Sequence, residues 1–217
     1  MKSQELLVAM KLASLGIHEA RRASKDIAPK AFAIRLPDEQ DGDWQPWSID
    51  HGIPPIHAEV SATNWTHRDL AKSLNISLSA CNRAIHGGLA RGLLRRSPRN
   101  HQILPNAAAL EEFLIHGAKY VFPTEYKAEA RGLPTCFAAP VLSDHLSSAG
   151  SQIYVWPDPF GNTQGTVLVP LNEAVVTSVK GDPILYGLLA LFDSIRSGQA
   201  RERNLAIEQL KKELSWL

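Results

Sequence analysis

The sequence predicts a mainly α-helical α+β fold, in which a helix–turn–helix and a β-ribbon precede a mixed C-terminal region that ends in two helices. Residues 66–94 have the pattern of two short helices joined by a tight turn. Residues 95–105 are typical of a tight ribbon, and residues 183–214 repeat apolar side chains at helical spacing. The chain has 217 residues, which is long enough to bury a substantial core.

The N-terminal segment predicts an amphipathic helix over residues 3–22, with Ser3 as its N-cap. Its apolar residues fit a helical stripe better than the apolar region of a signal peptide, because Glu5 and Lys11 interrupt that region. We therefore expect a helix of the folded protein here, and a cytoplasmic location.

Residues 24–63 lose the helical pattern and are predicted to form an acidic insertion. Between residues 36 and 50 there are five acids and no Lys or Arg, with Trp44 and Trp47 among them. Pro54-Pro55 excludes a helix just beyond. This acidity fits plain solubility, a partner-binding strap that carries the two Trp, or a mask for a basic surface.

The next segment carries the end signals of two short helices. Thr66 is the expected N-cap of the first, and Asp69, three residues later, completes a capping box. Asn75 can adopt the left-handed conformation that ends a helix, and Ser77 is the expected cap of the second. These helices are expected at residues 66–74 and 78–90.

Turn and cap signals continue into the ribbon. Pro98 and Asn100 are turn residues, and Ile103-Leu104 is the expected return strand. Asn106 is the expected cap of a helix over residues 107–120.

The C-terminal part is predicted from composition and periodicity. Residues 123–151 are rich in Pro, Gly, Ala and Ser and are expected to be irregular. The β-rich runs 153–156 and 166–169 flank a strong turn sequence and predict a small hairpin or ribbon. Asp182-Pro183 begins a helix that ends near residue 197, and residues 200–214 form the final one. We therefore expect two parts, residues 1–120 and residues 121–217.

Positive charge is concentrated in the helix–turn–helix and the ribbon. From Thr66 to Asn106 there are seven Lys or Arg residues against one acid, Asp69, while the rest of the chain has 16 basic and 21 acidic residues. The net charge of the whole chain is only +1. Such a local excess is typical of a protein that binds nucleic acid.

The second helix is the expected recognition element, because a helix with short or forked polar side chains fits the major groove of double-stranded DNA. Asn pairs bidentately with adenine and Arg with guanine. Base contacts are expected from Ser77, Ser79, Asn82, Arg83 and His86. Phosphate contacts are expected from the first helix and the ribbon: Thr66, Arg68, Lys72, Arg95, Arg96 and Arg99.

The segment LAKSLNISLSACNRAIHGGLARGLLRR resembles the winged helix–turn–helix of MarR- and IclR-like bacterial transcriptional regulators. The matching positions are Leu70, Leu74, Asn75, Ser77, Ser79, Asn82, Arg83 and Arg91-Gly92-Leu93-Leu94. The chain departs from that pattern at Gly87-Gly88, where a large apolar residue is usual. Two glycines cost a helix roughly 1.5–2 kcal/mol against alanine, so we expect the helix to be shortened or kinked there.

The resemblance implies a sequence-specific DNA-binding transcriptional regulator, a repressor that acts as a homodimer on double-stranded DNA. One alternative is an antitoxin-like winged-helix protein that binds an operon-encoded partner through its C-terminal half. Another is a winged helix that binds only proteins.

Apolar stripes on the first helix and on the last helix predict where two copies would meet. The expected seam consists of Leu6, Leu7, Met10, Leu205, Leu210 and Leu214. The alternative is that both stripes close on the protein's own core.

Motifs of catalysis and metal binding are absent from the sequence. It has no glycine-rich phosphate loop, no H-E-x-x-H and no C-x-x-C, and its histidines lack ligand spacing. Cys81 and Cys136 form neither a disulfide framework nor a metal-ligand pattern. No apolar run approaches the roughly 18 residues of a membrane span. We therefore expect no enzyme, no cofactor, no metal site and no membrane partner.

Overall fold

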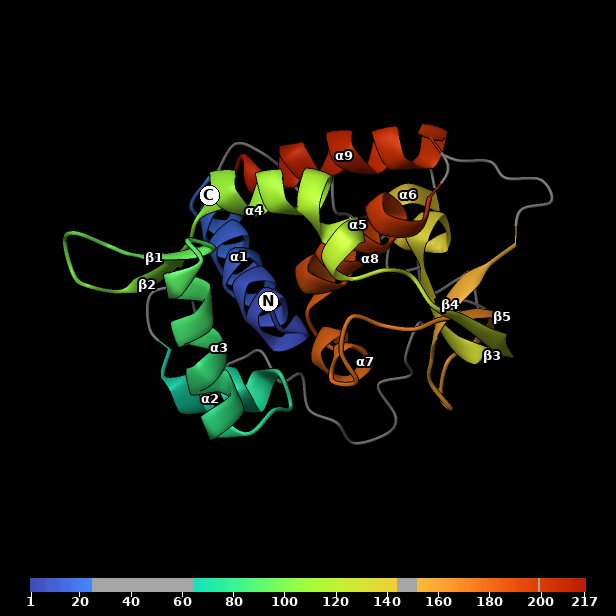
Figure 1. Cartoon of the computed structure of the whole chain (residues 1–217), viewed down its shortest axis with the longest axis horizontal. Helices are drawn as coiled ribbons and strands as arrows, with labels where there is room; N and C mark the ends of the chain where they lie inside the picture. The colour runs from blue at the N-terminus through green and yellow to red at the C-terminus, as the bar shows by residue number, and fades with distance from the viewer. Residues whose placement is uncertain (25–64, 144–151, 199) are drawn as a thin grey trace.

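Helix α1 (Ser3–Ala23) lies in the middle of the molecule (Figure 1). The computed structural model describes residues 1–24, 65–143, 152–198 and 200–217. The acidic insertion expected at residues 24–63 lies almost entirely outside the described residues. The N-cap of α1 is Lys2 rather than Ser3, because the Glu5 carboxylate accepts the backbone N–H of Lys2 at 3.0 Å. α1 contacts α3 and β2 on one side and α8 and α9 on the other.

The predicted helix–turn–helix is present as α2 (His67–Ser73) and α3 (Leu78–Ala90). The capping box is confirmed: Thr66 Oγ1 accepts the Asp69 backbone N–H at 3.2 Å, and Asp69 Oδ2 accepts the Thr66 N–H at 2.9 Å. Asn75 has a φ of 50° in the turn, and Ser77 caps α3 by accepting the Ala80 N–H. The local signals therefore place both helices correctly.

Gly87 and Gly88 neither shorten nor break α3, which continues to Ala90. A Cβ at Gly87 would overlap the Glu5 carboxylate on α1, and a Cβ at Gly88 would lie 2.9 Å from Leu94 Cδ1 on β1. The two glycines let α3 pack closely against α1 and against the ribbon. The expected shortening is therefore wrong, because tertiary packing offsets the low helix propensity of glycine.

The ribbon consists of β1 (Leu94–Arg96) and β2 (Ile103–Pro105), which pair antiparallel. It extends from the body of the molecule beside α3 (Figure 1). Asn106 then caps the expected helix, which has three parts. These are α4 (Ala107–Glu112), a π-helical turn η2 (Phe113–Gly117) and α5 (Ala118–Val121).

The segment expected to be irregular instead contains a ten-residue strand, β3 (Tyr126–Thr135). β3 pairs antiparallel with both β4 (Tyr154–Pro157) and β5 (Thr163–Leu168), and the three strands close into a small barrel. β4 and β5 are parallel where they meet, so the expected hairpin between them is wrong. Both strands form hydrogen bonds with β3, which the local turn sequence does not reveal.

Short helical turns follow the strands, and two long helices complete the described fold. The short ones are η3 (Cys136–Ala138), α6 (Pro140–Ser143) and α7 (Val175–Val179). α8 (Pro183–Ser197) begins as predicted, with Asp182 as its N-cap and Pro183 as its first residue. α9 (Ala200–Leu214) packs against α8.

A buried ion pair joins α1 to the start of α8. Lys11 Nζ lies 2.7 Å from Asp182 Oδ2, and Ser14 Oγ donates to the same oxygen at 2.6 Å. One hydrophobic core includes Leu6 of α1, Ile85 of α3 and Leu189 of α8. The two parts expected on either side of residue 120 therefore share a core.

A second buried polar cluster joins the barrel to α8. The Asp193 carboxylate accepts hydrogen bonds from Thr135 Oγ1 at 2.9 Å, Trp156 Nε1 at 2.7 Å and Arg196 Nε at 2.8 Å. Burial raises the pKa of the Asp193 carboxyl, and the positive charge of Arg196 opposes that shift. Arg196 also donates to the Val169 carbonyl at 2.8 Å, so its guanidinium links α8 to the chain that follows β5.

Candidate nucleic-acid interface

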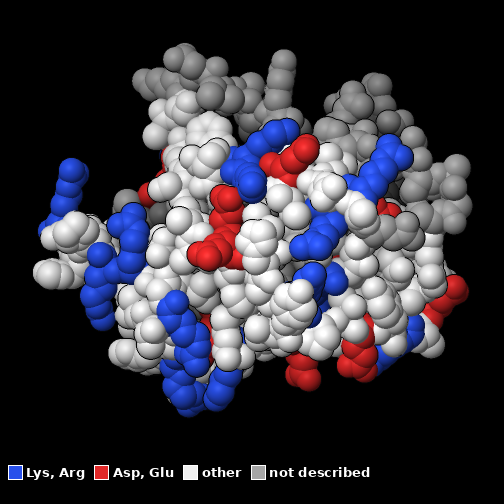
Figure 2. Space-filling view, turned by 45° about the horizontal axis from the view of Figure 1, so that its top comes forward, with Lys and Arg blue, Asp and Glu red and all other residues white. Residues whose placement is uncertain are grey.

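Six exposed cations lie on α2, α3 and the ribbon, which Figure 1 places along one side of the molecule. We call this set the basic surface: Arg68, Lys72, Arg83, Arg95, Arg96 and Arg99. Among the described residues, none of these six forms a salt bridge. Figure 2 shows Lys and Arg side chains gathered on the left part of its face, where Figure 1 places the ribbon and α3.

The one acid of this segment, Asp69, is held within α2. Hydrogen bonds from Thr66 hold the pKa of its carboxyl below the ordinary value, and the charges of Lys72 and Arg68 act in the same direction. Asp69 therefore stays ionised at neutral pH, and its oxygens are occupied by the capping box.

The exposed side of α3 carries most of the expected base-contacting residues. Ser79, Arg83 and His86 are exposed at helical spacing, while Cys81 and Ile85 are buried. This orientation of α3 agrees with the prediction from its periodicity. It leaves one serine hydroxyl, one guanidinium and one imidazole on the outward side of the helix.

Asn82 differs from its neighbours, because it is half-buried at the contact with α2. Its Oδ1 lies 2.6 Å from Nδ1 of His67, the first residue of α2. The His67 ring is itself stacked on Trp65, with ring centroids 5.8 Å apart. His67 is not among the residues predicted from the sequence, because only the crossing of α2 and α3 shows that it contacts Asn82.

Two of the expected contact residues serve as helix caps. The Thr66 hydroxyl donates to Asp69 Oδ2 at 2.6 Å, and Ser77 Oγ lies 3.2 Å from Ser79 Oγ. Thr66 and Ser77 are exposed, so their hydroxyls remain at the surface while they cap α2 and α3, and Ser79 is exposed beside them.

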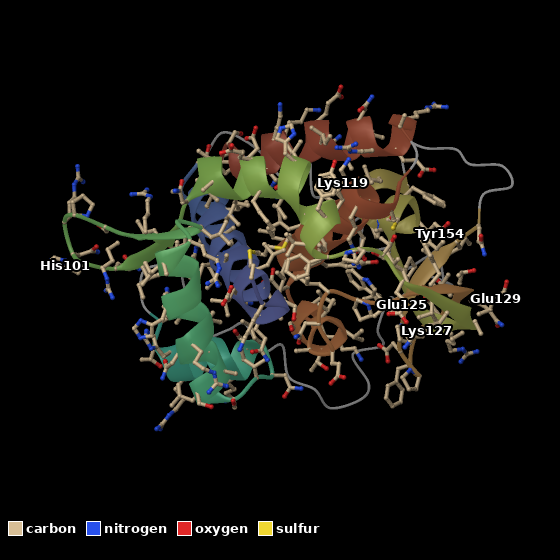
Figure 3. The ribbon with its side chains drawn as sticks, in the orientation of Figure 1. His101, Lys119, Glu125, Lys127, Glu129 and Tyr154 are labelled. Atoms are coloured by element: carbon tan, nitrogen blue, oxygen red, sulfur yellow. The ribbon has the colours of Figure 1, made fainter. Side chains whose placement is uncertain are left out.

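The ribbon presents Arg95 and Arg96 on β1 and Arg99 in the turn, all exposed. The turn is closed by a hydrogen bond from the Ser97 N–H to the Gln102 carbonyl at 2.8 Å. His101 lies at the outer end with a φ of 56°, as Figure 3 shows. His101 is not among the contact residues predicted from the sequence, but its imidazole adds another donor or acceptor at the tip of the ribbon.

Arg91, the seventh cation of the segment, is bonded within the protein. Its Nη1 lies 3.3 Å from Glu5 Oε1 and donates to the Gly87 carbonyl at 3.1 Å. It therefore connects the end of α3 to α1.

The expected dimer seam is corrected by the structure. Leu6, Leu7 and Met10 are at most 1% exposed, and Leu210 and Leu214 are also buried. Leu205 is partly buried against the same core. α1 lies between α3 and α8, and α9 covers α8, so these side chains are covered within one chain. A seam between two copies therefore has to use other surfaces.

Cys81 packs in the hydrophobic core, whereas Cys136 Sγ lies 3.2 Å from Ser197 Oγ. Both Cys81 and Cys136 are buried and not paired in a disulfide. Burial raises the pKa of the Cys81 thiol to about 11, which disfavours the reactive thiolate at neutral pH. Within the described ranges, no group of three or more His, Cys, Asp or Glu side chains is placed to hold a metal ion.

Comparisons with known proteins found no relative of this chain. No family model matches the chain, and neither a curated protein nor a solved structure is similar to it. None of the helices in the described residues has both the length and the apolar character that crossing a membrane requires.

Proposed function

We propose that this chain is a sequence-specific DNA-binding transcriptional regulator of the winged helix–turn–helix type, acting as a homodimeric repressor. In this proposal α3 enters the major groove, α2 contacts the phosphate backbone beside it, and the ribbon is the wing. Double-stranded DNA is the partner.

The observation that carries the proposal is the basic surface. Its six cations are exposed, come from three adjacent elements, and lack salt-bridge partners among the described acids. Exposed cations in such an arrangement neutralise phosphates and release counterions, which supplies most non-specific affinity for DNA.

Specific recognition is assigned to the outward side of α3. Arg83 can donate two hydrogen bonds to guanine O6 and N7, and Ser79 and His86 flank it on the same side. α1 supports α3 from behind through the Gly87–Glu5 contact. A rigid support of this kind is needed if α3 is to keep one position in the groove.

The homodimer is proposed because a helix of this length contacts few base pairs, and two copies on a palindrome double the recognised sequence. Light scattering on the full-length protein at micromolar concentration measures its mass directly. A monomer at that concentration, both free and on DNA, contradicts this part of the proposal.

The test of DNA binding is a mobility-shift titration of double-stranded DNA at several salt concentrations. Affinity should fall steeply as salt rises. Arg83→Ala should reduce the preference for a selected sequence over random DNA roughly 5- to 150-fold, the effect of one bidentate contact, while the other five cations of the basic surface maintain non-specific binding. A protein that binds neither its own promoter nor random DNA at low salt contradicts the proposal.

A further inference from the structure

We propose that His67 is a positioning residue that fixes which side of the Asn82 amide faces the DNA bases. This inference rests on the proposed function, because it requires α3 to lie in the major groove. The observation behind it is a hydrogen bond of 2.6 Å between Nδ1 of His67 on α2 and Oδ1 of Asn82 on α3. Both side chains are half-buried.

The direction of this bond follows from the atom of Asn82 that faces His67. An amide oxygen can only accept, so Nδ1 of His67 carries a proton and donates it to Asn82 Oδ1. In the neutral tautomer that is protonated at Nε2, Nδ1 has no proton. It would then accept a hydrogen bond from Asn82 Nδ2, and the amide would have to be turned around. The stacked Trp65 ring, inclined by 25° to the imidazole, holds His67 in place at the start of α2.

The consequence is a restriction on what Asn82 can recognise. Adenine is recognised by asparagine through two bonds, in which Oδ1 accepts from N6 and Nδ2 donates to N7. With Oδ1 directed to His67, the amide presents the N–H groups of Nδ2 to the groove. The two N–H groups of Nδ2 meet two acceptors on guanine, O6 and N7, and one on thymine, O4, whereas adenine offers only N7 beside an amino group that opposes the second N–H. We therefore assign to Asn82 a keto base, in place of the adenine expected from its residue type.

Site selection from randomised duplexes with the full-length protein tests this assignment. Comparing the wild type with Asn82→Ala identifies the position that Asn82 recognises, and the wild type should select guanine or thymine there. His67→Phe keeps a ring and removes the donor. The amide can then turn, and discrimination against adenine at that position should fall roughly fivefold, the usual effect of one hydrogen bond.

Two further variants separate positioning from a general structural effect. His67→Asn places Nδ2 where Nδ1 stood, so it should restore the wild-type preference at that position. His18→Phe makes the same substitution at an exposed position of α1 and should leave the selected sequence unchanged. Circular dichroism shows whether each variant has folded.

Nitrogen NMR of the histidine side chains provides a readout that does not require DNA. A protonated His67 Nδ1 is expected, and an unprotonated Nδ1 that accepts from Asn82 would overturn the assignment. Selection of adenine by the wild type, or an unchanged preference in folded His67→Phe, would also overturn it. If the wild type binds no DNA at low salt, the proposed function fails together with the base assignment, while the NMR result still shows which way the amide faces.

Discussion

The two sides of the molecule hold their positive charges in opposite ways. Around α8, the side chains of Lys11 and Arg196 are 0% and 3% exposed, and each is paired with a buried aspartate, Asp182 and Asp193. On the basic surface, the cations are exposed and have no salt-bridge partner among the described residues. A buried charge must be paired to be tolerated, whereas an exposed charge is available to another molecule. The first set is therefore bound within the fold, and the second is available to the DNA of the proposed function.

The largest effect is expected from breaking a buried pair. Asp193→Ala removes the partner of Arg196 and leaves the Thr135 hydroxyl and the Trp156 N–H without their acceptor. We expect the free energy of unfolding to fall by about 3–5 kcal/mol, measured by urea denaturation. Glu208→Ala, on the exposed side of α9, is the control and should change little. Equal stability of the two variants would show that the Asp193 carboxylate does not stabilise the contact between α8 and the barrel.

The next effect is expected on the basic surface, in affinity rather than stability. Replacing Arg95, Arg96 and Arg99 together by Ala should weaken binding to all DNA sequences at least tenfold. It should also reduce the slope of log affinity against log salt by about three, or one for each phosphate contact. The unfolding free energy should stay within about 0.5 kcal/mol of the wild type, because the three side chains are exposed.

The barrel offers a control for this triple variant at exposed cations outside the basic surface. Lys127 and Arg131 are exposed on β3. Figure 3 shows Lys127 between Glu125 and Glu129, on the side of the molecule opposite His101. Replacing Lys127 and Arg131 by Ala should leave DNA affinity unchanged. An equal loss of affinity in both variants would mean that overall charge, and not the basic surface, determines binding.

A smaller effect is expected where α3 meets α1. Gly87→Ala places a methyl group against the Glu5 carboxylate, which costs about 1–3 kcal/mol by overpacking. Alanine returns about 1 kcal/mol of helix propensity, so a net loss of about 1 kcal/mol in unfolding free energy is expected. In a double-mutant cycle with Glu5→Ala, the Gly87→Ala cost should disappear, because the overlapping group is gone. Additive losses would contradict a direct contact.

The smallest effect is a pH dependence at the capping box. Hydrogen bonds from Thr66 hold the folded-state pKa of Asp69 below its ordinary value of 3.8. Its contribution to stability is therefore present above pH 3.8 and is lost as the pH falls through the folded-state value. The difference in urea midpoint between wild type and Asp69→Asn should be constant near neutral pH and should shrink below pH 3.8. If the difference in urea midpoint grew in acid instead, the pKa of Asp69 would be raised in the folded state, which contradicts the prediction.

Elements with local end signals could be predicted from the sequence, and the barrel could not. Thr66, Asn75 and Ser77 mark the limits of α2 and α3 through contacts within a few residues. β3 gives no such signal, because its first half is exposed and its second half is buried, so polar and apolar residues do not alternate. Its partners β4 and β5 lie farther along the chain, beyond residue 151.

The candidate site likewise has features that the sequence predicts and features that depend on how the chain folds. The exposure of Arg83 and His86 follows from helical periodicity, which a sequence displays directly. The bond between Asn82 and His67 depends on how two helices cross. The burial of Leu6 and Met10 depends on α8, which contacts α1 across a long stretch of chain. An apolar stripe shows that a helix is covered, but it does not show whether the cover is the same chain or a second copy.

The central place of α1 has a consequence for how the protein is made. α1 leaves the ribosome before α8, and Asp182, the partner of its Lys11, is added 171 residues after Lys11. Until then the apolar side chains that α8 covers have no native neighbour, so this chain relies on contacts of high sequence separation and is expected to fold slowly. Nascent chains that expose such a helix are prone to aggregate and to be held by chaperones. A prematurely terminated chain that ends before α8 contains α2 and α3 but lacks the finished support behind them.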